Sequence, residues 1–196
     1  MTNFNIKIEN IVASATLGVK VPLEKMVEYL EGSEYEPEQF PGLVYRIQNP
    51  KAAMLIFSSG KVVCTGARSI TDVRKAVEKV AVMLRSLKIE VPKKYKIQIE
   101  NIVASAQVPS IVASSHVPSR LDLDKIAFEV ENSEYEPSQF PGLVYRMKDP
   151  KVAFLLFGSG KVICTGTRKI EDIEYAMDFL FKKLKTINAL KTPPAK

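Results

Sequence analysis

The residues that most often catalyse reactions or bind metals are few in this sequence. Its 196 residues include two cysteines, Cys64 and Cys164, and one histidine, His116. No two of them have the spacing of metal ligands, and no Ser-His-Asp or Cys-His combination suggests an activated nucleophile. The SSG and FPG motifs do not join a strand to a helix, so they predict turns rather than phosphate-binding loops. We therefore expect a protein that is not an enzyme and that holds no metal or cofactor.

Cationic and aromatic side chains, in contrast, recur at matched positions. Arg46, Lys61 and Arg68 fall where short strands are expected to end or turn, and each has a copy 100 residues later. Phe40 and Phe57 are 17 residues apart, and so are their copies. The formal net charge of +6 and the pI near 9.2 favour a polyanionic partner. These residues point to binding of nucleic acid rather than to catalysis.

The matches arise because the sequence is a tandem repeat. IENIVASA occurs at residues 8–15 and again at 99–106. Residues 33–72 and 133–172 share 28 identities in 40 positions. A period of 90 to 100 residues is too long for a solenoid unit, so each half is expected to be a small α/β unit. Two similar halves imply a pseudo-twofold axis, as in a fused homodimer.

The second half contains nine additional residues, because the offset between the halves grows from 91 to 100. IVASAQVPS at 102–110 is followed at once by IVASSHVPS at 111–119. This duplication predicts a longer surface loop. It also leaves two candidates for the central strand, 99–106 and 111–115, of which the first is favoured because it retains Asn101. We expect a first repeat over 1–93, a second over 94–190 with the insertion within 106–122, and a basic, frayed tail over 191–196.

Composition excludes several classes of protein. With 46% hydrophobic and 26% charged residues, the chain is expected to be globular rather than disordered. No apolar run approaches the roughly 20 residues that span a bilayer, and the first residues do not resemble a secretory signal. Two cysteines are too few for a disulfide scaffold, so we expect buried free thiols in a reducing compartment.

Hydrophobic periodicity predicts the same elements in each half. Apolar alternation predicts a strand over 6–14, and an apolar stripe predicts a helix over 22–31. Later apolar runs, separated by Asn-Pro and Ser-Gly turns, predict three strands and then a helix capped by Thr71 or Asp72. The strands are expected over 43–47, 52–58 and 61–66 and the helix to about 88, with Ile173, Met177, Leu180, Leu184 and Ile187 as the stripe of its copy.

The predicted strands have largely apolar faces on both sides. Helices can cover only one face of such a sheet, which we expect to be the face of Val62 and Cys64 rather than that of Val63 and Thr65. An uncovered apolar face usually marks a binding surface, unless a dimer partner or a further layer buries it. Other residues expected to share a face are Asn10 with Val12, opposite Ile11 and Ala13, and Leu55 with Phe57.

An apolar floor with a cationic rim suits the minor groove of DNA. Sugars and base edges in that groove are fairly apolar, and phosphates line both of its edges. Asn and Thr side chains in the floor can hydrogen-bond adenine N3 and thymine O2, whereas close contact rejects the guanine amino group. The pattern therefore favours A·T-rich DNA.

The doubled motif resembles a known family. FPGLVYR, a PK-x-A-x-L-x-F run and SGKVVCTGAR at 40–68, their copy at 140–168 and both IENIVAS strands are similar to the TATA-box-binding proteins. The similarity covers residues 4 to about 188, and the lack of a Gln-rich N-terminal extension is similar to the archaeal form. It implies an α+β saddle of two pseudo-twofold repeats, whose curved ten-stranded antiparallel sheet carries four main helices on its convex face. It also implies a general transcription initiation factor that binds the TATA box in the minor groove.

The resemblance further implies which residues bind DNA. Two pairs, Phe40 with Phe57 and Phe140 with Phe157, would wedge into base steps and kink the duplex. The central polar residues are Asn10, Asn101, Thr65 and Thr165. The apolar floor is Val12, Val103, Leu55, Leu155, Val63 and Ile163. The phosphate-facing rim is Arg46, Ser59, Lys61, Arg68, Arg146, Ser159, Lys161 and Arg168.

The partners implied by the resemblance are TATA-containing duplex DNA, a B-type general transcription factor and, through the initiation complex, RNA polymerase. Glu134 and Glu136 lie in the stirrup segment where the family meets the B-type factor. Glu34 and Glu36 are identical in type, so only the family assigns the second stirrup. The implied location is cytoplasmic and nucleoid-associated in an archaeal cell, without membrane contact.

Two other functions remain alternatives at this stage. One is an enzyme that carries this fold as a nucleic-acid module, although the chain has no room for a catalytic domain. The other is a homo-oligomeric scaffold that buries its apolar sheet. A weak homodimer in the absence of DNA is compatible with DNA binding.

Overall fold

The computed structural model describes residues 5–110 and 118–192. His116 and the alternative strand candidate at 111–115 lie outside the described residues. The chain divides into two compact units, of which the first is Glu9–Asn101 and the second comprises most of the remainder. Each unit is described on its own below.

The first unit contains the elements predicted from periodicity, with ends shifted by up to three residues, and one two-residue strand over Ser33–Glu34 that periodicity did not predict. No described helix is both long and apolar enough to cross a membrane. The elements are β1 (Lys7–Thr16), α1 (Leu23–Tyr29), β2 (Ser33–Glu34), β3 (Gly42–Ile47), β4 (Ala52–Phe57), β5 (Lys61–Ala67) and α2 (Ile70–Ser86).

The second unit repeats this order and adds two short strands. Its central strand, β6 (Ile97–Gln107), includes residues 99–106, as predicted. The other elements are β7 (Arg120–Leu121), α3 (Leu123–Glu129), β8 (Ser133–Glu134), β9 (Gly142–Met147), β10 (Val152–Phe157), β11 (Lys161–Thr167), α4 (Ile170–Thr186) and β12 (Leu190–Lys191).

Ten of the strands form one antiparallel sheet, in the order β2-β3-β4-β5-β1-β6-β11-β10-β9-β8. The α+β class, the ten strands, the four helices and the two repeats are therefore confirmed. A second, two-stranded sheet pairs β12 with β7, and sequence analysis did not predict it. Within it, Lys191 Nζ lies 2.7 Å from Asp122 Oδ2. The expectation of a frayed tail from residue 191 onward is thus wrong for Lys191, because this strand pair and the ion pair hold it.

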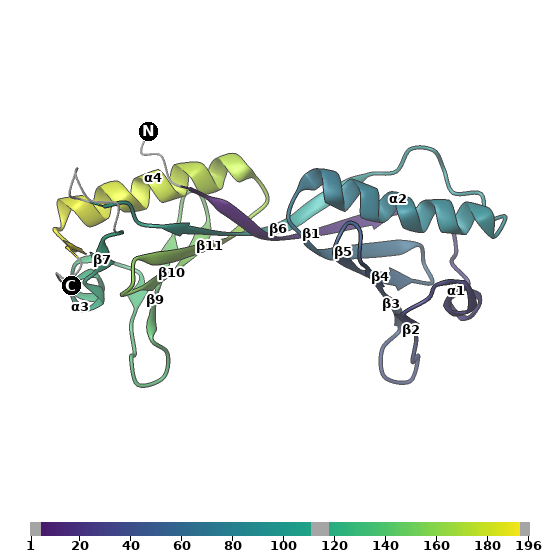
Figure 1. Cartoon of the computed structure of the whole chain (residues 1–196), viewed down its shortest axis with the longest axis horizontal. Helices are drawn as coiled ribbons and strands as arrows, with labels where there is room; N and C mark the ends of the chain where they lie inside the picture. Colours follow the sequence, from purple (N-terminus) through teal and green to yellow (C-terminus); the bar gives the residue numbers. More distant parts are fainter. Residues whose placement is uncertain (1–4, 111–117, 193–196) are drawn as a thin grey trace. The chain divides into compact units, whose positions relative to one another are not determined.

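In each unit the long helix lies along one face of the strands (Figure 1). In the first unit α2 packs on β4 and β5, and Ile11, Met54 and Cys64 are buried beneath it. Their strand neighbours on the other face are only half-buried. The predicted alternation is therefore confirmed. Both thiols are free and buried, and burial raises the pKa of Cys64 to about 11 and that of Cys164 to about 12.

The core of the second unit is more aromatic. Phe154 replaces Met54 in β10 and stacks on Tyr145 with ring centroids 5.8 Å apart and planes 8° apart. Lys183 on α4 holds its Nζ 5.6 Å from the centre of the Tyr145 ring. Tyr145 is accordingly buried.

Matched hydrogen bonds locate the nine-residue insertion. The N–H of Leu17 donates to the carbonyl of Gly60, and the N–H of Val108 donates to that of Gly160, both at 2.9 Å. A side chain added at Gly160 would collide with the carbonyl oxygen of Ser119, as one added at Gly60 would with that of Val19, so these two carbonyls have matching places. The extra residues of the second repeat therefore fall in the sequence between Val108 and Ser119.

The N-terminus of α2 corrects one prediction. Ser69, rather than Thr71 or Asp72, is the capping residue: its backbone is extended, and its Oγ accepts from the Asp72 N–H at 3.0 Å. Ser69 Oγ also donates to Asp72 Oδ2 at 2.7 Å. Asp72 therefore lies inside the first turn, where its negative charge interacts favourably with the positive end of the helix dipole. The matching residue of α4, Lys169, makes no side-chain cap.

We expect Ser69→Ala to destabilise the protein by about 0.5–2 kcal/mol, because an N–H of the first turn of α2 loses its acceptor. Lys169→Ala is the matched control and should change the free energy of unfolding by less than about 0.5 kcal/mol. Urea denaturation of both variants measures the difference. Equal effects of the two substitutions would contradict the assigned cap.

Candidate nucleic-acid interface

Each unit has one sheet face that its long helix does not cover. In the first unit the strand register places Ser14, Val63, Leu55 and Val44 side by side across β1, β5, β4 and β3. All four are half-buried, whereas the residues that alternate with them on the other face are buried, except Tyr45, which is half-buried. We call this side the open face. Besides that row it carries Asn10, Val12, Ala53, Phe57 and Thr65.

The open face of the second unit has the same register. Ser105, Ile163, Leu155 and Val144 form the row that matches the one above. A second row runs through Val103, Thr165, Ala153 and Arg146. The predicted floor residues of each repeat are therefore brought together on one face.

The amide of Asn10 is held in a fixed orientation. A register irregularity between β1 and β5 accompanies Gly66, whose φ of +86° suits glycine far better than other residues. The Gly66 N–H donates to Asn10 Oδ1 at 2.7 Å. Asn10 Nδ2 lies 3.3 Å from Thr65 Oγ1. Because Oδ1 accepts the backbone bond, the amide NH₂ is presented as a donor beside Thr65.

An aromatic pair lies where β4 ends, and another where β10 ends. Phe40 and Phe57 have ring centroids 5.8 Å apart and meet edge to face at 65°. Phe140 and Phe157 repeat this at 5.9 Å and 69°. Phe40 is 38% and Phe140 40% exposed, so neither ring is a core residue. The sequence spacing of 17 residues thus corresponds to a ring contact in both repeats.

Backbone hydrogen bonds before each pair fix the first ring. The carbonyl of Glu36 accepts from the N–H groups of Gln39 and Phe40 at 3.0 and 2.9 Å. The carbonyl of Glu136 does the same for Gln139 and Phe140. The turn that carries the exposed ring is therefore ordered by its own backbone.

The cations of the rim are exposed, and three of the arginines lie close to carboxylates. Arg46 Nη1 lies 2.8 Å from Glu34 Oε1, and Arg68 Nη2 lies 3.8 Å from Glu9 Oε2. In the second unit Arg146 Nε lies 3.8 Å from Glu134 Oε1. Exposed pairs of this kind contribute only about 0–1 kcal/mol, so a phosphate can replace the carboxylate. The remaining rim residues, Ser59, Lys61, Ser159, Lys161 and Arg168, lie at the turns before β5 and β11 or just after β11.

Sequence analysis missed the carboxylate partners of these arginines. Glu34 pairs with Arg46, and β2 aligns it opposite Val44 in the structure. The repeat copied both residues, so sequence matching alone could not distinguish an ion pair from two independent sites. A second omission is Gln107, whose Nε2 donates to the Ser159 carbonyl at 2.8 Å. Its counterpart in the first repeat is Thr16. This difference between the repeats is visible in the sequence, but no role was assigned to it.

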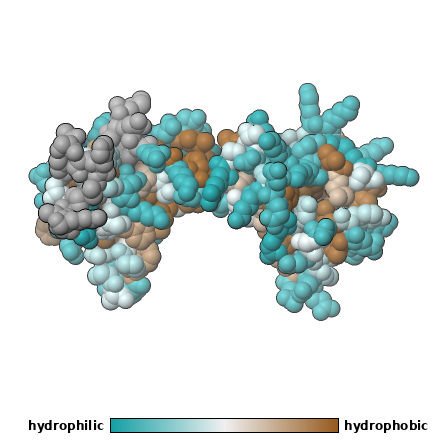
Figure 2. Space-filling model, viewed as in Figure 1, coloured by the Kyte–Doolittle hydropathy of each residue, from teal (hydrophilic) through white to brown (hydrophobic). Residues whose placement is uncertain are grey.

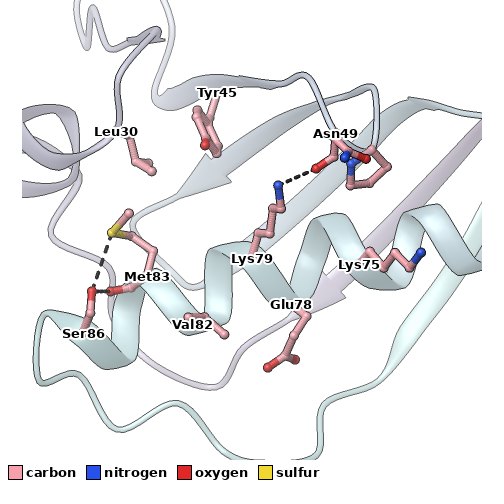
Figure 3. A pocket seen from close by; sticks show the side chains of 10 residues that line it. Leu30, Tyr45, Asn49, Lys75, Glu78, Lys79, Val82, Met83 and Ser86 are labelled. Carbon is pink, nitrogen blue, oxygen red and sulfur yellow. Dashed lines mark hydrogen bonds between the residues drawn. The ribbon is translucent and has the colours of Figure 1, made fainter.

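The helix-covered side offers no comparable chemistry. A hollow between α2, the end of α1 and the β3–β4 turn has a largely apolar lining, with Lys79 Nζ donating to the Asn49 carbonyl at its edge (Figure 3). In the side view of Figure 2 hydrophilic residues predominate at the surface, with apolar residues between them. Within residues 5–110 and 118–192, no three His, Cys, Asp or Glu side chains gather in a way that could hold a metal ion. The apolar lining of the hollow shown in Figure 3 consists of Leu30, Tyr45, Pro50, Val82 and Met83.

Comparison with known proteins decides the family. The family model described as transcription factor TFIID, or TATA-binding protein, matches residues 5–87 and 105–187. The chain belongs to the TATA-binding protein family. This membership confirms the resemblance seen in the sequence and places the chain among DNA-binding transcription factors rather than among enzymes.

Individual members of the TATA-binding protein family match nearly end to end. The TATA-box-binding protein of Methanobrevibacter smithii is 48% identical over 190 residues, which are 97% of this chain and 100% of that protein. The one from Methanothermobacter thermautotrophicus is 51% identical over 178 residues, covering 91% and 93%. The solved structure of Methanococcus jannaschii TBP aligns with a TM-score of 0.83 at 46% identity, covering 92% of this chain and 98% of that one. As expected, these relatives are archaeal.

Proposed function

We propose that this protein is a general transcription initiation factor that binds the TATA box in the minor groove, kinks the duplex with its two Phe pairs and presents the bent complex to a B-type factor and RNA polymerase. The observation that carries the proposal is the open face of each unit: a half-buried apolar floor with an exposed aromatic pair at one edge, to which the first unit adds the fixed amide donor of Asn10. The names of the archaeal relatives agree with it.

The floor suits A·T base pairs by its hydrogen-bonding capacity. In the minor groove A·T pairs present only acceptors, adenine N3 and thymine O2, while G·C adds the guanine amino donor. Asn10 offers a donor there because Gly66 occupies its oxygen. The side chains of Val12, Leu55 and Val63 on the same face are apolar and offer no acceptor to a guanine amino group. The floor is therefore expected to select A·T pairs, because Asn10 donates a hydrogen bond to their acceptors and the apolar side chains accept none from guanine.

The Phe pairs suit the role of wedges. Inserting an apolar side chain partly unstacks a base step at a cost of about a few kcal/mol, and members of this family are the reference case for such wedges, so the kink is carried over from them. Rings that are already exposed and ordered in the free protein lose little conformational entropy on insertion. Phe40 and Phe140 meet both conditions.

The stirrup of the second repeat is the proposed contact for the B-type factor. Glu34 is held by Arg46 at 2.8 Å, whereas Glu134 is 3.8 Å from Arg146; the two glutamate side chains are similarly exposed, at 66% and 71%. Glu136 accepts a hydrogen bond from Ser138 Oγ at 2.7 Å. The looser carboxylate of the second stirrup is more available to a cationic partner. RNA polymerase would join through this complex, at the nucleoid of an archaeal cell.

The same open faces offer a surface for self-association when DNA is absent. Uncovered apolar patches of this kind favour weak dimers. Light scattering with and without a TATA duplex would detect a dimer that DNA dissociates, which is the behaviour expected if both partners use the same face.

Selectivity for A·T should depend on the amide of Asn10. In gel shifts the wild type should prefer a TATA duplex to a G·C-substituted one, and Asn10→Asp should lower TATA affinity roughly 5- to 150-fold, because an acceptor then faces acceptors. Gln48→Glu, at an exposed turn, makes the same change of charge elsewhere and should keep the preference. An Asn10→Asp variant with wild-type TATA affinity would contradict the proposed readout.

Binding should depend on salt through the rim. With about six to eight phosphate contacts, log K should fall with log salt at a slope of roughly −5 to −7. Arg46→Ala should weaken binding to all sequences alike and reduce that slope by about one. Arg74→Ala removes an exposed cation on the α2 side and serves as the control with an unchanged slope. Affinity that does not vary with salt would rule out the rim.

The Phe157→Ala variant should show whether this ring acts as a wedge on DNA or as part of the hydrophobic core. The variant should retain non-specific binding, lose TATA affinity and bending, and melt close to the wild type, because the partly exposed ring leaves no closed cavity. Phe154→Ala is the control: that ring is fully buried, and its loss should cost roughly 3–5 kcal/mol. Thermal melting and fluorescence energy transfer across the bent duplex measure both properties. Strong destabilisation with normal bending would exclude the wedge.

A further inference from the structure

A glycine lies directly beneath each aromatic pair. Gly42 is the cross-strand partner of Phe57 in β3 and β4, and it follows Phe40 by two residues. Gly42 is buried, although both rings above it are partly exposed. Gly142 has the same place below Phe140 and Phe157.

The rings occupy the space that a side chain would need. A methyl group at position 42 would lie 2.7 Å from Cε1 of Phe40 and 3.0 Å from Cε1 of Phe57. At position 142 the corresponding distances are 2.6 and 3.0 Å. Ordinary contacts between carbon atoms are about 3.5–4.0 Å, so the rings would have to move by roughly 1 Å.

The backbone at these two positions does not itself require glycine. Gly60, Gly66, Gly160 and Gly166 have φ between +82° and +103°, in the region that favours glycine. Gly42 and Gly142 have no such φ and lie within regular strand pairing. An L-residue could therefore adopt this backbone, and the three atoms nearest to an added methyl group all belong to the rings.

We propose that Gly42 and Gly142 are positioning residues for the two wedges: the absence of a side chain lets both rings lie across the strand and meet edge to face at a fixed height. This inference rests on the proposed function and names the residues that set its geometry. A base step accepts a wedge of limited thickness, so the height and angle of the rings above the sheet determine how far the step opens.

The test uses Gly142→Ala in the full-length chain. The variant should melt at or above the wild-type temperature, because alanine restricts the unfolded chain more than glycine does and the displaced atoms are ring edges that can move. TATA affinity should fall by about tenfold and the bend measured by energy transfer should decrease. Non-specific affinity should not change, since the phosphate rim is intact.

Gly158→Ala is the matched control for adding a methyl group to a glycine of the same unit. At position 158 the nearest atom to the added carbon is the Leu121 carbonyl oxygen at 3.9 Å, and the first repeat already carries Ser58 there. This variant should bind and bend as the wild type does. In the free protein, nuclear Overhauser contacts between the Phe140 and Phe157 rings should change in Gly142→Ala and stay the same in Gly158→Ala.

The outcomes distinguish the inference from the proposed function. If Phe157→Ala leaves bending normal, the wedge function itself fails, whatever position 142 does. If Phe157→Ala abolishes bending but Gly142→Ala bends and binds as the wild type does, the positioning role is overturned. A large drop in melting temperature for Gly142→Ala, or an equal loss of bending in Gly158→Ala, would also overturn it.

Discussion

An antiparallel sheet with apolar side chains on both faces needs both faces covered, and in each unit the long helix covers only one. Beneath α2, residues such as Ile11 and Met54 are fully buried, and their strand neighbours on the other face are left half-buried. The helix side supplies the stability of the unit. The open face is therefore free to be selected for binding, and the arrangement of amide, apolar floor and aromatic pair depends on this one-sided covering.

The two repeats keep the open face more closely alike than the helix side. Residues 40–68 and 140–168 are identical at 20 of 29 positions, whereas α2 and α4 differ in capping, in charge and in most of their residues. Ser69 caps one helix and Lys169 does not cap the other. Tyr145 is buried under Lys183, while Tyr45 is only half-buried beside Met83. A helix can be secured to a sheet by many different side chains, whereas the proposed binding floor tolerates few, which accounts for the greater divergence of the helices.

The face of each strand residue was predictable because successive side chains point to opposite sides of a strand. Once one residue is assigned to the covered face, the faces of its neighbours follow. Cys64 and Thr65 could be assigned to opposite faces from the sequence alone, and the central strand could be chosen because only one candidate retained Asn101. The cap at Ser69 was missed because Thr71 and Asp72 are equally good capping types and only the backbone conformation distinguishes them. The β7–β12 pair and the partners of Arg46 and Arg146 depend on contacts across the fold, which periodicity does not encode. The proposed roles of the site residues came from the family resemblance. Spacing alone would have paired the Phe residues without suggesting that they act as wedges.

The glycines beneath the aromatic pairs connect stability with function. Glycine in a strand weakens the native state, and a phenyl ring left in water forgoes burial that a core position would give it. Both features occur together, twice, at the edge of an otherwise well-packed unit. If folding alone had shaped these positions, a small apolar residue at 42 and a buried ring at 40 would have been the more stable choice. The native arrangement instead keeps the rings ordered and accessible in the free protein, so the proposed distortion of the duplex would require little reorganisation of the protein.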